Sequence, residues 1–235
     1  MARRARSQSD HPPAVTQDAL VAAALVVLNR DGLDGLSMRR VAAELGVQAA
    51  SLYWHVAHKE ELLDLLADAL LIGLDLDVPA DADWREQTRV MAHAYRDHLK
   101  SRRDAARVIS GRFIIGTNAA ALMDRALGVF RAGGFAPDEA AAALHLVYVA
   151  HVQGFVVQEI EPMRAVEALG GTPADAMDVV TAELDELGPD RFPHLAEVAG
   201  YLTTINLDAR FTWGLDCILD GLEHRLTQRA GSPDQ

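Results

Sequence analysis

The stretch SMRRVAAELGVQAASLYWHV, residues 37–56, decides how the front of this 235-residue chain is expected to fold. Ser37 is a good N-cap for a short helix over 38–45, and Gly46 suits the left-handed turn that would end it. A second short helix is predicted over about 48–55. Apolar side chains at helical spacing would hold the two helices together: Val41, Leu45, Val47, Leu52 and Val56. The pattern therefore predicts a helix-turn-helix.

The second helix of this pair carries residue types that suit the major groove of DNA. Small side chains at Ala49 and Ala50 let a helix backbone approach closely, and Gln48 can hydrogen-bond to base edges. Hydroxyls and cations that can hold phosphate groups lie on this helix or near it: Ser51, Tyr53, Arg39 and Lys59. A helix pair that only packs and binds nothing fits the same pattern, so the motif by itself leaves both interpretations open.

Outward from this stretch, helical spacing of apolar residues continues along most of the chain. Thr16 can cap a helix that Gly32 would stop, another helix is expected to begin near His58, and Asp83 opens the next. Between 161 and 200, glycines and prolines predict a loop-rich crossing with one short helix. Further helical segments are predicted at about 103–110, 117–132, 137–160, 174–187 and 203–229.

No strand pattern and no repeat is visible, so the chain is predicted to be all-α. We expect a disordered basic arm over 1–14, a three-helix helix-turn-helix domain over 15–60 and a larger helical domain over 61–230. The formal net charge is −12, yet residues 1–60 hold seven Lys/Arg against six Asp/Glu. Only this front part is therefore expected to approach a phosphate backbone.

Cysteine content and the apolar runs predict the location. The single cysteine, Cys217, permits no intramolecular disulfide, which suits a reducing cytoplasm. Arg3, Arg4 and Arg6 precede an apolar run as in a signal peptide, but charged residues and prolines intervene and no small-residue cleavage site follows. No apolar stretch is expected to reach the ~18 residues that span a bilayer. We therefore expect a cytoplasmic protein without a membrane partner.

The front of the chain resembles the tetracycline-repressor (TetR) family in GLSMRRVAAELGV at 35–47, SLYWHV at 51–56 and KEELLD at 59–64. This resemblance implies DNA binding through the helix-turn-helix. Ala49 and Ala50 replace polar or proline residues that the tetracycline repressors use, so a different operator sequence is expected. The positions that match the family's DNA contacts are Arg39, Gln48, Ala49, Ala50, Ser51, Tyr53, His55 and Lys59.

The resemblance continues behind residue 60. SRRDAARV at 101–108, FVVQE at 155–159 and the segment 213–226 resemble the family's ligand-binding and dimerisation domain, which implies those roles for 61–230. In the family, the helix that matches 137–160 both lines the ligand pocket and joins the dimer. The candidate ligand contacts are Met91, Tyr95, Ile109, Arg112, Phe113, His145, Tyr148 and His151.

The pocket positions depart from those of the tetracycline repressors, which bind a magnesium–drug chelate. Ile109 stands where those repressors have a histidine, Met91 where they have an asparagine, and Asp75 where they have another pocket histidine. A chelated metal needs nitrogen or oxygen donors, which an isoleucine cannot supply. The expected effector is therefore a largely apolar small molecule held without a metal, and no cofactor is expected.

Spacing also argues against a metal site elsewhere, because the histidine pairs 93/98 and 145/151 are five and six residues apart, whereas metal-binding pairs on a helix are usually three or four apart. The sequence thus predicts a transcriptional regulator, a repressor that binds a palindromic operator as a homodimer and is released by a small molecule. The alternative is an all-α enzyme acting on a small apolar substrate. No Gly-rich phosphate loop, nucleophile elbow or zinc pattern favours that alternative.

Overall fold

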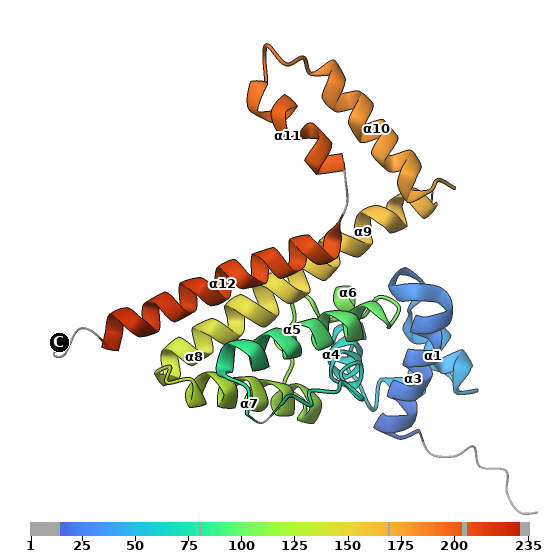
Figure 1. The fold of residues 1–235 in the computed structure, drawn as a ribbon. Coiled ribbons are helices and arrows are strands. Elements are labelled where there is room, and N and C mark those ends of the chain that lie inside the picture. Colours follow the sequence, from blue (N-terminus) through green and yellow to red (C-terminus); the bar gives the residue numbers. More distant parts are fainter. Residues whose placement is uncertain (1–14, 80, 169, 204–205, 231–235) are drawn as a thin grey trace, which may run out of the picture. The chain divides into compact units, whose positions relative to one another are not determined.

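The computed structural model describes residues 15–79, 81–168, 170–203 and 206–230, so the predicted basic arm at 1–14 lies outside the described residues. Every regular element within these ranges is a helix, and no strand occurs among them. Figure 1 shows the helices, coloured from blue at the N-terminal end to red at the C-terminal end. The all-α prediction is therefore confirmed.

Contacts divide the chain into two compact units that are not continuous in sequence. The first unit consists of the described residues up to Gly73 together with Ser101–Ala120. The second unit consists of Leu74–Lys100 together with the described residues from Ala121 onward. The expected domain limits at 15–60 and 61–230 describe continuous segments and stay predictions.

The first unit is built from short helices with clear start and stop residues. As expected, the Thr16 hydroxyl accepts a hydrogen bond from the Ala19 amide at 3.1 Å and caps the first helix. Gly32 interrupts that helix with φ +74°, a left-handed conformation that glycine adopts easily. The helices of this unit are α1 (Gln17–Gly35), α2 (Met38–Glu44), α3 (Ala49–Leu52), α4 (Lys59–Ala69) and α6 (Ala105–Ile109).

α3 is shorter than the helix expected over 48–55, because only Ala49–Leu52 is α-helical. The amides of His55 and Val56 both donate to the Leu52 carbonyl, at 2.9 and 3.1 Å. The first of these bonds spans three residues and tightens the chain into a turn, which places Val56 in the core with 1 % of its surface exposed. Burial of Val56 thus ends the helix early.

The second unit is dominated by longer helices. α8, η1 and α9 follow one another without a break in helical backbone, and η1 is a π-helical segment. α12 packs on η1 and buries one face through Phe211, Leu215 and Leu219. The helices are α5 (Trp84–Lys100), α7 (Thr117–Ala132, from Ala121 on), α8 (Pro137–Leu144), η1 (His145–Gln153), α9 (Gly154–Ala168), α10 (Pro173–Glu186), α11 (Pro193–Thr203) and α12 (Leu207–Ala230).

The loop-rich crossing predicted between 161 and 200 is wrong. α9 continues to Ala168, and α10 and α11 pack against each other as a helical hairpin. Pro173 and Pro193 stand at the first positions of their helices, where a missing amide proton is tolerated. Gly188 has φ +76° in the connection. The prolines and glycines therefore mark helix starts and stops in place of a long loop.

The helical run Pro137–Ile160 is long and apolar enough, by length and composition, to cross a membrane, which corrects the expectation that no stretch would be. That expectation counted uninterrupted apolar residues and overlooked a helix whose few polar residues are widely spaced. Only 33 % of the most apolar 18-residue stretch of this run is buried within the chain. An apolar helix that packs inside a protein or against a second chain satisfies the same criteria.

Candidate nucleic-acid interface and ligand site

The turn between α2 and α3 holds the two helices together. The amides of Gly46 and Val47 donate to the carbonyls of Ala43 and Ala42 at 3.1 and 3.0 Å, and Gly46 has φ +68°. Leu52 on α3 is fully buried, so the opposite face of this short helix is left toward solvent. This geometry is that of the predicted helix-turn-helix.

All eight residues that match the family's DNA contacts reach the surface of the first unit. Their role as contacts stays a prediction, but none of them is consumed by core packing. Four are exposed and four are partly exposed: Arg39, Gln48, Ala50 and Tyr53 in the first group, and Ala49, Ser51, His55 and Lys59 in the second.

The cations near α2 and α3 fall into two groups. Arg30 and Arg40 both pair with Asp31, at 3.1 and 3.2 Å. Within the described residues, neither Arg39 nor Lys59 forms an ion pair. An unpaired surface cation can neutralise a phosphate without first giving up another partner. Among the described residues near α2 and α3, the two cations assigned to phosphates from the sequence, Arg39 and Lys59, are thus without an ion pair.

Trp54 belongs to the same surface, although it is not among the residues that match the family's DNA contacts. Its side chain is 89 % exposed, next to the exposed Tyr53. Exposed apolar side chains that adjoin one another, as Tyr53 and Trp54 do, commonly mark a binding surface, whereas isolated ones do not. The signal was present in the sequence, because Leu52 and Val56 are four residues apart and buried, which turns Trp54 between them outward.

The start of α4 adds a feature that suits an anion. His58 Nδ1 accepts from the Glu61 amide at 3.1 Å, and Glu61 Oε2 accepts from the Ala57 amide at 2.6 Å, so the helix start is capped from both sides. Lys59 is the first helical residue, where the helix dipole disfavours a cation. A phosphate at this position would be stabilised both by the dipole and by Lys59.

Segment 101–120 is tied to the end of α1 within the first unit. Asp104 accepts from the Leu33 amide at 2.7 Å. Arg103 Nη1 donates to the carbonyls of Asn29 and Arg30 at 3.0 and 2.8 Å. The motif that resembles the family's drug-pocket segment therefore also satisfies backbone groups at the end of the first helix.

The same segment is tied to α4 farther along. Arg112 pairs with Glu60 at 2.6 Å and with Asp64 at 2.8 Å. Asp68 accepts from the Ala119 amide at 2.8 Å and so caps the start of α7. Three successive turns of α4 thus contact segment 101–120, and a displacement of that segment would act directly on α4.

The candidate ligand residues differ in burial, and their role stays a prediction. Ile109 and Arg112 belong to the first unit, where Arg112 is engaged with α4. Phe113 is 86 % exposed. Four are buried, two are partly exposed and two are exposed: Met91, Tyr95, Ile109 and Tyr148 in the first group, Arg112 and His151 in the second, and Phe113 and His145 in the third. Among the described residues, no cluster of three His, Cys, Asp or Glu side chains could hold a metal ion.

Two histidines of the second unit pack on the ring of Phe211. The ring centroids of His93 and His151 lie 5.0 and 4.8 Å from that ring, and His151 Nε2 is 3.0 Å from the Phe211 carbonyl oxygen. Burial lowers the pKa of both imidazoles, and the Arg96 guanidinium lowers it further; the bond to Phe211 partly opposes this for His151. Both rings are therefore held neutral near pH 7.

A buried arginine joins three helices next to these histidines. Arg96 on α5 pairs with Glu159 on α9 at 3.0 Å and with Asp208 on α12 at 2.7 Å. Its guanidinium lies 4.7 Å from the centre of the Phe211 ring. Arg96 lowers the pKa of the Asp208 carboxyl through their hydrogen bond. Lys100 also pairs with Glu159, so two cations and two carboxylates balance within the cluster, which fits a structural role in helix packing.

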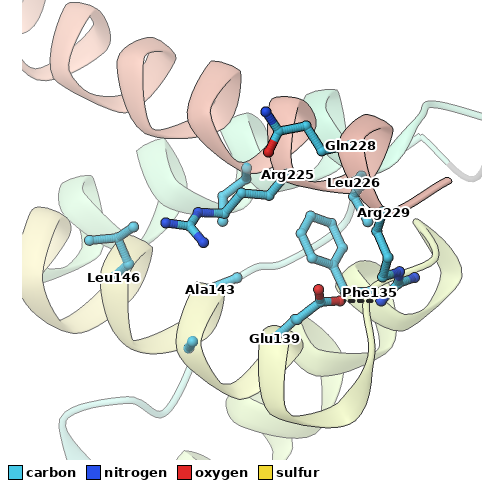
Figure 2. A pocket seen from close by; sticks show the side chains of 10 residues that line it. Phe135, Glu139, Ala143, Leu146, Arg225, Leu226, Gln228 and Arg229 are labelled. Carbon is cyan, nitrogen blue, oxygen red and sulfur yellow. Dashed lines mark hydrogen bonds and ion pairs between the residues drawn. The ribbon is translucent and has the colours of Figure 1, made fainter. Parts of the chain in front are cut away.

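A groove of about 550 Å³ lies between α8 and α12 (Figure 2). Its wall on the α8 side includes Ala143 and Leu146, and its wall on α12 includes Leu222 and Leu226. An ion pair joins Glu139 on α8 to Arg229 on α12, and both residues line the groove. The groove is thus lined by apolar side chains together with charged residues of α8 and α12.

Comparison with known proteins identifies the class. The description "Bacterial regulatory proteins, tetR family" matches residues 20–66, and "Tetracyclin repressor-like, C-terminal domain" matches 78–226, more than half of the chain. The HTH-type transcriptional repressor DrrR1 of Streptomyces coeruleorubidus is 33% identical over 223 residues, 93% of this chain and 81% of DrrR1. The tetracycline repressor class A from transposon 1721 of Escherichia coli is 34% identical over 215 residues, 88% of this chain and 90% of that protein.

Solved structures agree with these relatives. Apo ActR from Streptomyces coelicolor has a TM-score of 0.78 and 33% identity, over 92% of this chain and 98% of ActR. ActR in complex with actinorhodin has a TM-score of 0.77 and 34% identity, over 89% of this chain and 96% of ActR. The protein is therefore a helix-turn-helix transcriptional regulator with a C-terminal helical domain. It belongs to the tetracycline-repressor (TetR) family, as the sequence predicted.

Proposed function

We propose that this protein is a repressor that binds a palindromic operator as a homodimer and leaves it when a small, largely apolar molecule binds. The observation that carries the DNA-binding part is the pair of unpaired cations, Arg39 and Lys59, on the surface that presents α3. The effector part is supported by the similarity to ActR, which was crystallised with actinorhodin.

In the proposed complex, α3 enters the major groove. Ala49 and Ala50 let its backbone approach, and Gln48 at the N-cap position contacts base edges. Phosphates are held by Arg39 and by Lys59 at the start of α4. We add Trp54 to the proposed contacts because its exposed ring can pack against the sugar–phosphate backbone. The remaining contacts proposed are Ser51, Tyr53 and His55.

The phosphate contacts can be tested with two adjacent arginines as a matched pair. A footprint on the promoter region beside the protein's own gene locates the operator, and fluorescence anisotropy then measures affinity at several salt concentrations. Arg39→Ala should lower the slope of log K against log salt by about 1 per subunit, because one phosphate contact is lost. Arg40→Ala removes the same charge, but Arg40 is paired with Asp31, so its slope should stay near that of the unmodified protein. Equal slopes in both variants would remove the basis for assigning Arg39.

Gln48 should act on sequence preference more than on general affinity. A good side-chain contact to a base edge discriminates by about 1–3 kcal/mol. We expect Gln48→Ala to relax the preference at one position of each half-site while keeping most of the salt dependence. Selection of operators from a randomised half-site measures this. If the selected sequences are unchanged, another residue of α3 reads the bases.

The homodimer is supported by apolar surface that the single chain leaves open. Leu146 and Val149 on η1 and Trp213 on α12 are exposed, and the groove is lined by residues of α8, by Leu146 on η1 and by residues of α12. We propose that a second copy of the chain covers this surface, with α8–η1–α9 and α12 of each subunit forming a four-helix interface around a two-fold axis.

The effector site is proposed to hold its ligand without a metal. Ile109 in the first unit and Met91 in the second are each buried, and neither side chain offers the nitrogen or oxygen donor that a chelated metal needs. Addition of magnesium or of a chelator should therefore leave effector binding unchanged. Ligand can weaken DNA binding only if it favours the arrangement that does not fit the operator. The ion pairs and hydrogen bonds between segment 101–120 and α4 would transmit this change, because a shift of that segment would displace α4.

The alternative of an all-α enzyme gains no support, since the relatives described above are transcriptional regulators. We propose no catalytic residues and no cofactor. A cytoplasmic location follows from the proposal, because operator DNA of a bacterial-type regulator is found there. A membrane role for the run Pro137–Ile160 is not part of the proposal, because the dimer interface accounts for its apolar surface.

A further inference from the structure

Gly214 leaves room on α12 for the imidazole ring of His151 on η1. A Cβ atom at position 214 would lie 2.7 Å from His151 Cε1, which is closer than real Cβ atoms approach another side chain. Gly214 is not among the glycines with a positive φ, so its backbone does not require a glycine. A glycine inside a helix lowers helix stability relative to alanine. The space that a side chain at 214 would fill is thus occupied by the His151 ring.

Two further contacts hold the His151 ring against α12. Its Nε2 atom is 3.0 Å from the Phe211 carbonyl oxygen, which can only accept, so the neutral ring carries its proton on Nε2. The ring also stacks on that of Phe211, with the centroids 4.8 Å apart and the planes inclined by 26°. Phe211 precedes Gly214 by three residues. All three contacts of His151 therefore fall within one turn of α12.

The ion pairs between α5 and α12, in contrast, are spaced by whole turns of α12. They join Arg96 to Asp208, Arg89 to Asp216 and Arg85 to Asp220, at 2.7, 2.8 and 2.5 Å. Asp208 and Asp220 are largely exposed, so each of these pairs contributes little stability. The buried apolar residues of α12 also recur every four positions, at Phe211, Leu215 and Leu219. Contacts with such a repeat select the face of α12 that packs, but they distinguish poorly between positions one turn apart.

The His151–Gly214 contact fits one register of α12 only. A shift of α12 by one turn, about 5.4 Å, would bring Arg210 or Ile218 to the place of Gly214, where either side chain would collide with the ring. The register matters for the proposed dimer face, because η1 and α12 form that face together. Leu146 on η1 and Leu222 on α12, for example, line the same groove. A shift would misalign the two halves of the face.

The groups around His151 disfavour a positive charge on its ring. Arg96 and His93 on α5 face it, and the carboxylates nearby are engaged with cations: Glu159 on α9 with Arg96 and Lys100, and Asp208 on α12 with Arg96. Burial and then the Arg96 charge lower the pKa of His151, and its hydrogen bond to a backbone carbonyl only partly opposes this. A ring that leaves α12 regains its ordinary pKa. Proton uptake therefore favours the released ring.

We propose that the His151–Gly214 contact fixes the register of α12 on η1, and that proton uptake by His151 releases this contact and weakens the dimer. His151 is thus a positioning residue, which acts through α12. This inference rests on the proposed homodimer, because it states what keeps the two halves of the dimer face aligned. The protein would then lose operator affinity in mild acid through its second unit, with the DNA-binding surface unchanged.

Gly214→Ala and Gly221→Ala test the contact as a matched pair. Each adds one methyl group to α12, but only the group at 214 meets His151, since nothing lies within 4 Å of a Cβ at 221. Hydrogen exchange of the full-length protein at pH 7.5 is read by mass spectrometry. Gly214→Ala should speed exchange over 207–216 by about 5- to 100-fold, the range expected of overpacking. Gly221→Ala should leave it as slow as in the unmodified protein. Unchanged exchange in Gly214→Ala would overturn the proposal.

The double variant His151→Ala/Gly214→Ala tests the proton step, because removal of the ring makes room for the added methyl group. It should exchange more slowly over 207–216 than Gly214→Ala alone. Light scattering over a dilution series should show the dimer dissociation constant of the unmodified protein rising by about 3- to 10-fold from pH 7.5 to 5.5. The double variant should show no such rise.

A rise that persists in the double variant would assign the pH dependence to other groups and overturn the proposal. An unmodified protein that is monomeric at both pH values would instead contradict the proposed homodimer. Hydrogen exchange would still decide in that case whether His151 and Gly214 hold α12, because it does not depend on association. The operator footprint is measured at neutral pH and decides the DNA-binding function separately.

Discussion

His93 and His151 show how single residues of the second unit can couple stability to pH. Both imidazoles are held against Phe211, and the Arg96 guanidinium makes a positive charge on either ring unfavourable. Asp97 and Asp208 partly offset this for His93. In the unfolded chain each histidine titrates near its ordinary pKa of about 6.5. The folded state therefore takes up protons at lower pH than the unfolded state does.

The sign of the resulting pH dependence follows directly. As pH falls through about 6.5, the two histidines become protonated in the unfolded chain but stay neutral in the folded protein. The free energy of unfolding therefore decreases until the folded rings are protonated as well. We expect urea denaturation to show this loss between pH 7.5 and 5.5, and a smaller loss in the double variant His93→Gln/His151→Gln. His145→Gln, at an exposed histidine, is the control and should behave like the unmodified protein. An unchanged loss in the double variant would assign the pH dependence to other groups.

The residues of the DNA-binding surface could be predicted only in part. Leu52 at the end of α3 and Val56 in the turn after it are both buried, and their spacing of four residues predicts which positions between them face outward. Nothing in the sequence distinguishes Arg39 from Arg40, however. The difference arises because Asp31, which lies on α1, is within reach of Arg40 and leaves its neighbour unpaired. Such cross-helix pairing depends on tertiary packing and has no local signal.

At the scale of elements, α4 and α7 are joined by a cap that comes from another helix. Asp68 on α4 accepts from the Ala119 amide in the first turn of α7 and from the Asn118 side chain at 2.9 Å. Gly116 makes this approach possible, because a Cβ at that position would lie 2.1 Å from the Asp68 carboxyl carbon. Asp68 and Gly116 together thus hold the start of α7 against α4 within the first unit.

Gly116→Ala and Gly128→Ala should change stability in opposite directions. A methyl group at Gly116 would push the Asp68 carboxylate away and uncap α7, so we expect a loss of about 1–2 kcal/mol in the free energy of unfolding. A methyl group at Gly128, inside α7, meets nothing within 4 Å and should add about 0.5–1 kcal/mol through higher helix propensity. Urea denaturation of the two variants measures both. A stabilising Gly116→Ala would mean that Asp68 does not cap α7 in solution.

Most helix starts were predictable from local chemistry, and the exceptions have physical reasons. Thr16, Ser37 and Asp83 each accept a hydrogen bond from an amide in the first turn, as their residue types suggest. α11 was missed because Pro193 looks like a helix breaker until the chain before it is known to turn at Gly188. The π-helical geometry of η1 has no sequence signature, since it depends on how Tyr148 packs against α5.

At the scale of the whole molecule, charge and apolar surface have different distributions. The residues after 60 carry 15 Lys/Arg and 28 Asp/Glu, so this part repels a phosphate backbone and restricts DNA binding to the front. The same part holds the run Pro137–Ile160, of which only a third of the most apolar window is buried. Burial of apolar surface contributes about 25 cal/mol per Å², which favours covering this run with a second copy.

Dimerisation can be tested by adding one charge to two equally exposed apolar residues. Light scattering at micromolar concentration should give twice the chain mass of 25.4 kDa for the unmodified protein. Leu146→Glu, at a residue that is 42 % exposed beside the groove, should raise the dimer dissociation constant at least ~10-fold, because a two-fold axis buries the added charge twice. Val26→Glu on α1, 46 % exposed, adds the same charge outside the proposed interface and should leave the dimer intact. A monomeric unmodified protein, or a Leu146→Glu variant that associates as tightly, would contradict the proposed four-helix interface. Loss of the dimer should also abolish tight operator binding, since one α3 alone contacts only one half-site.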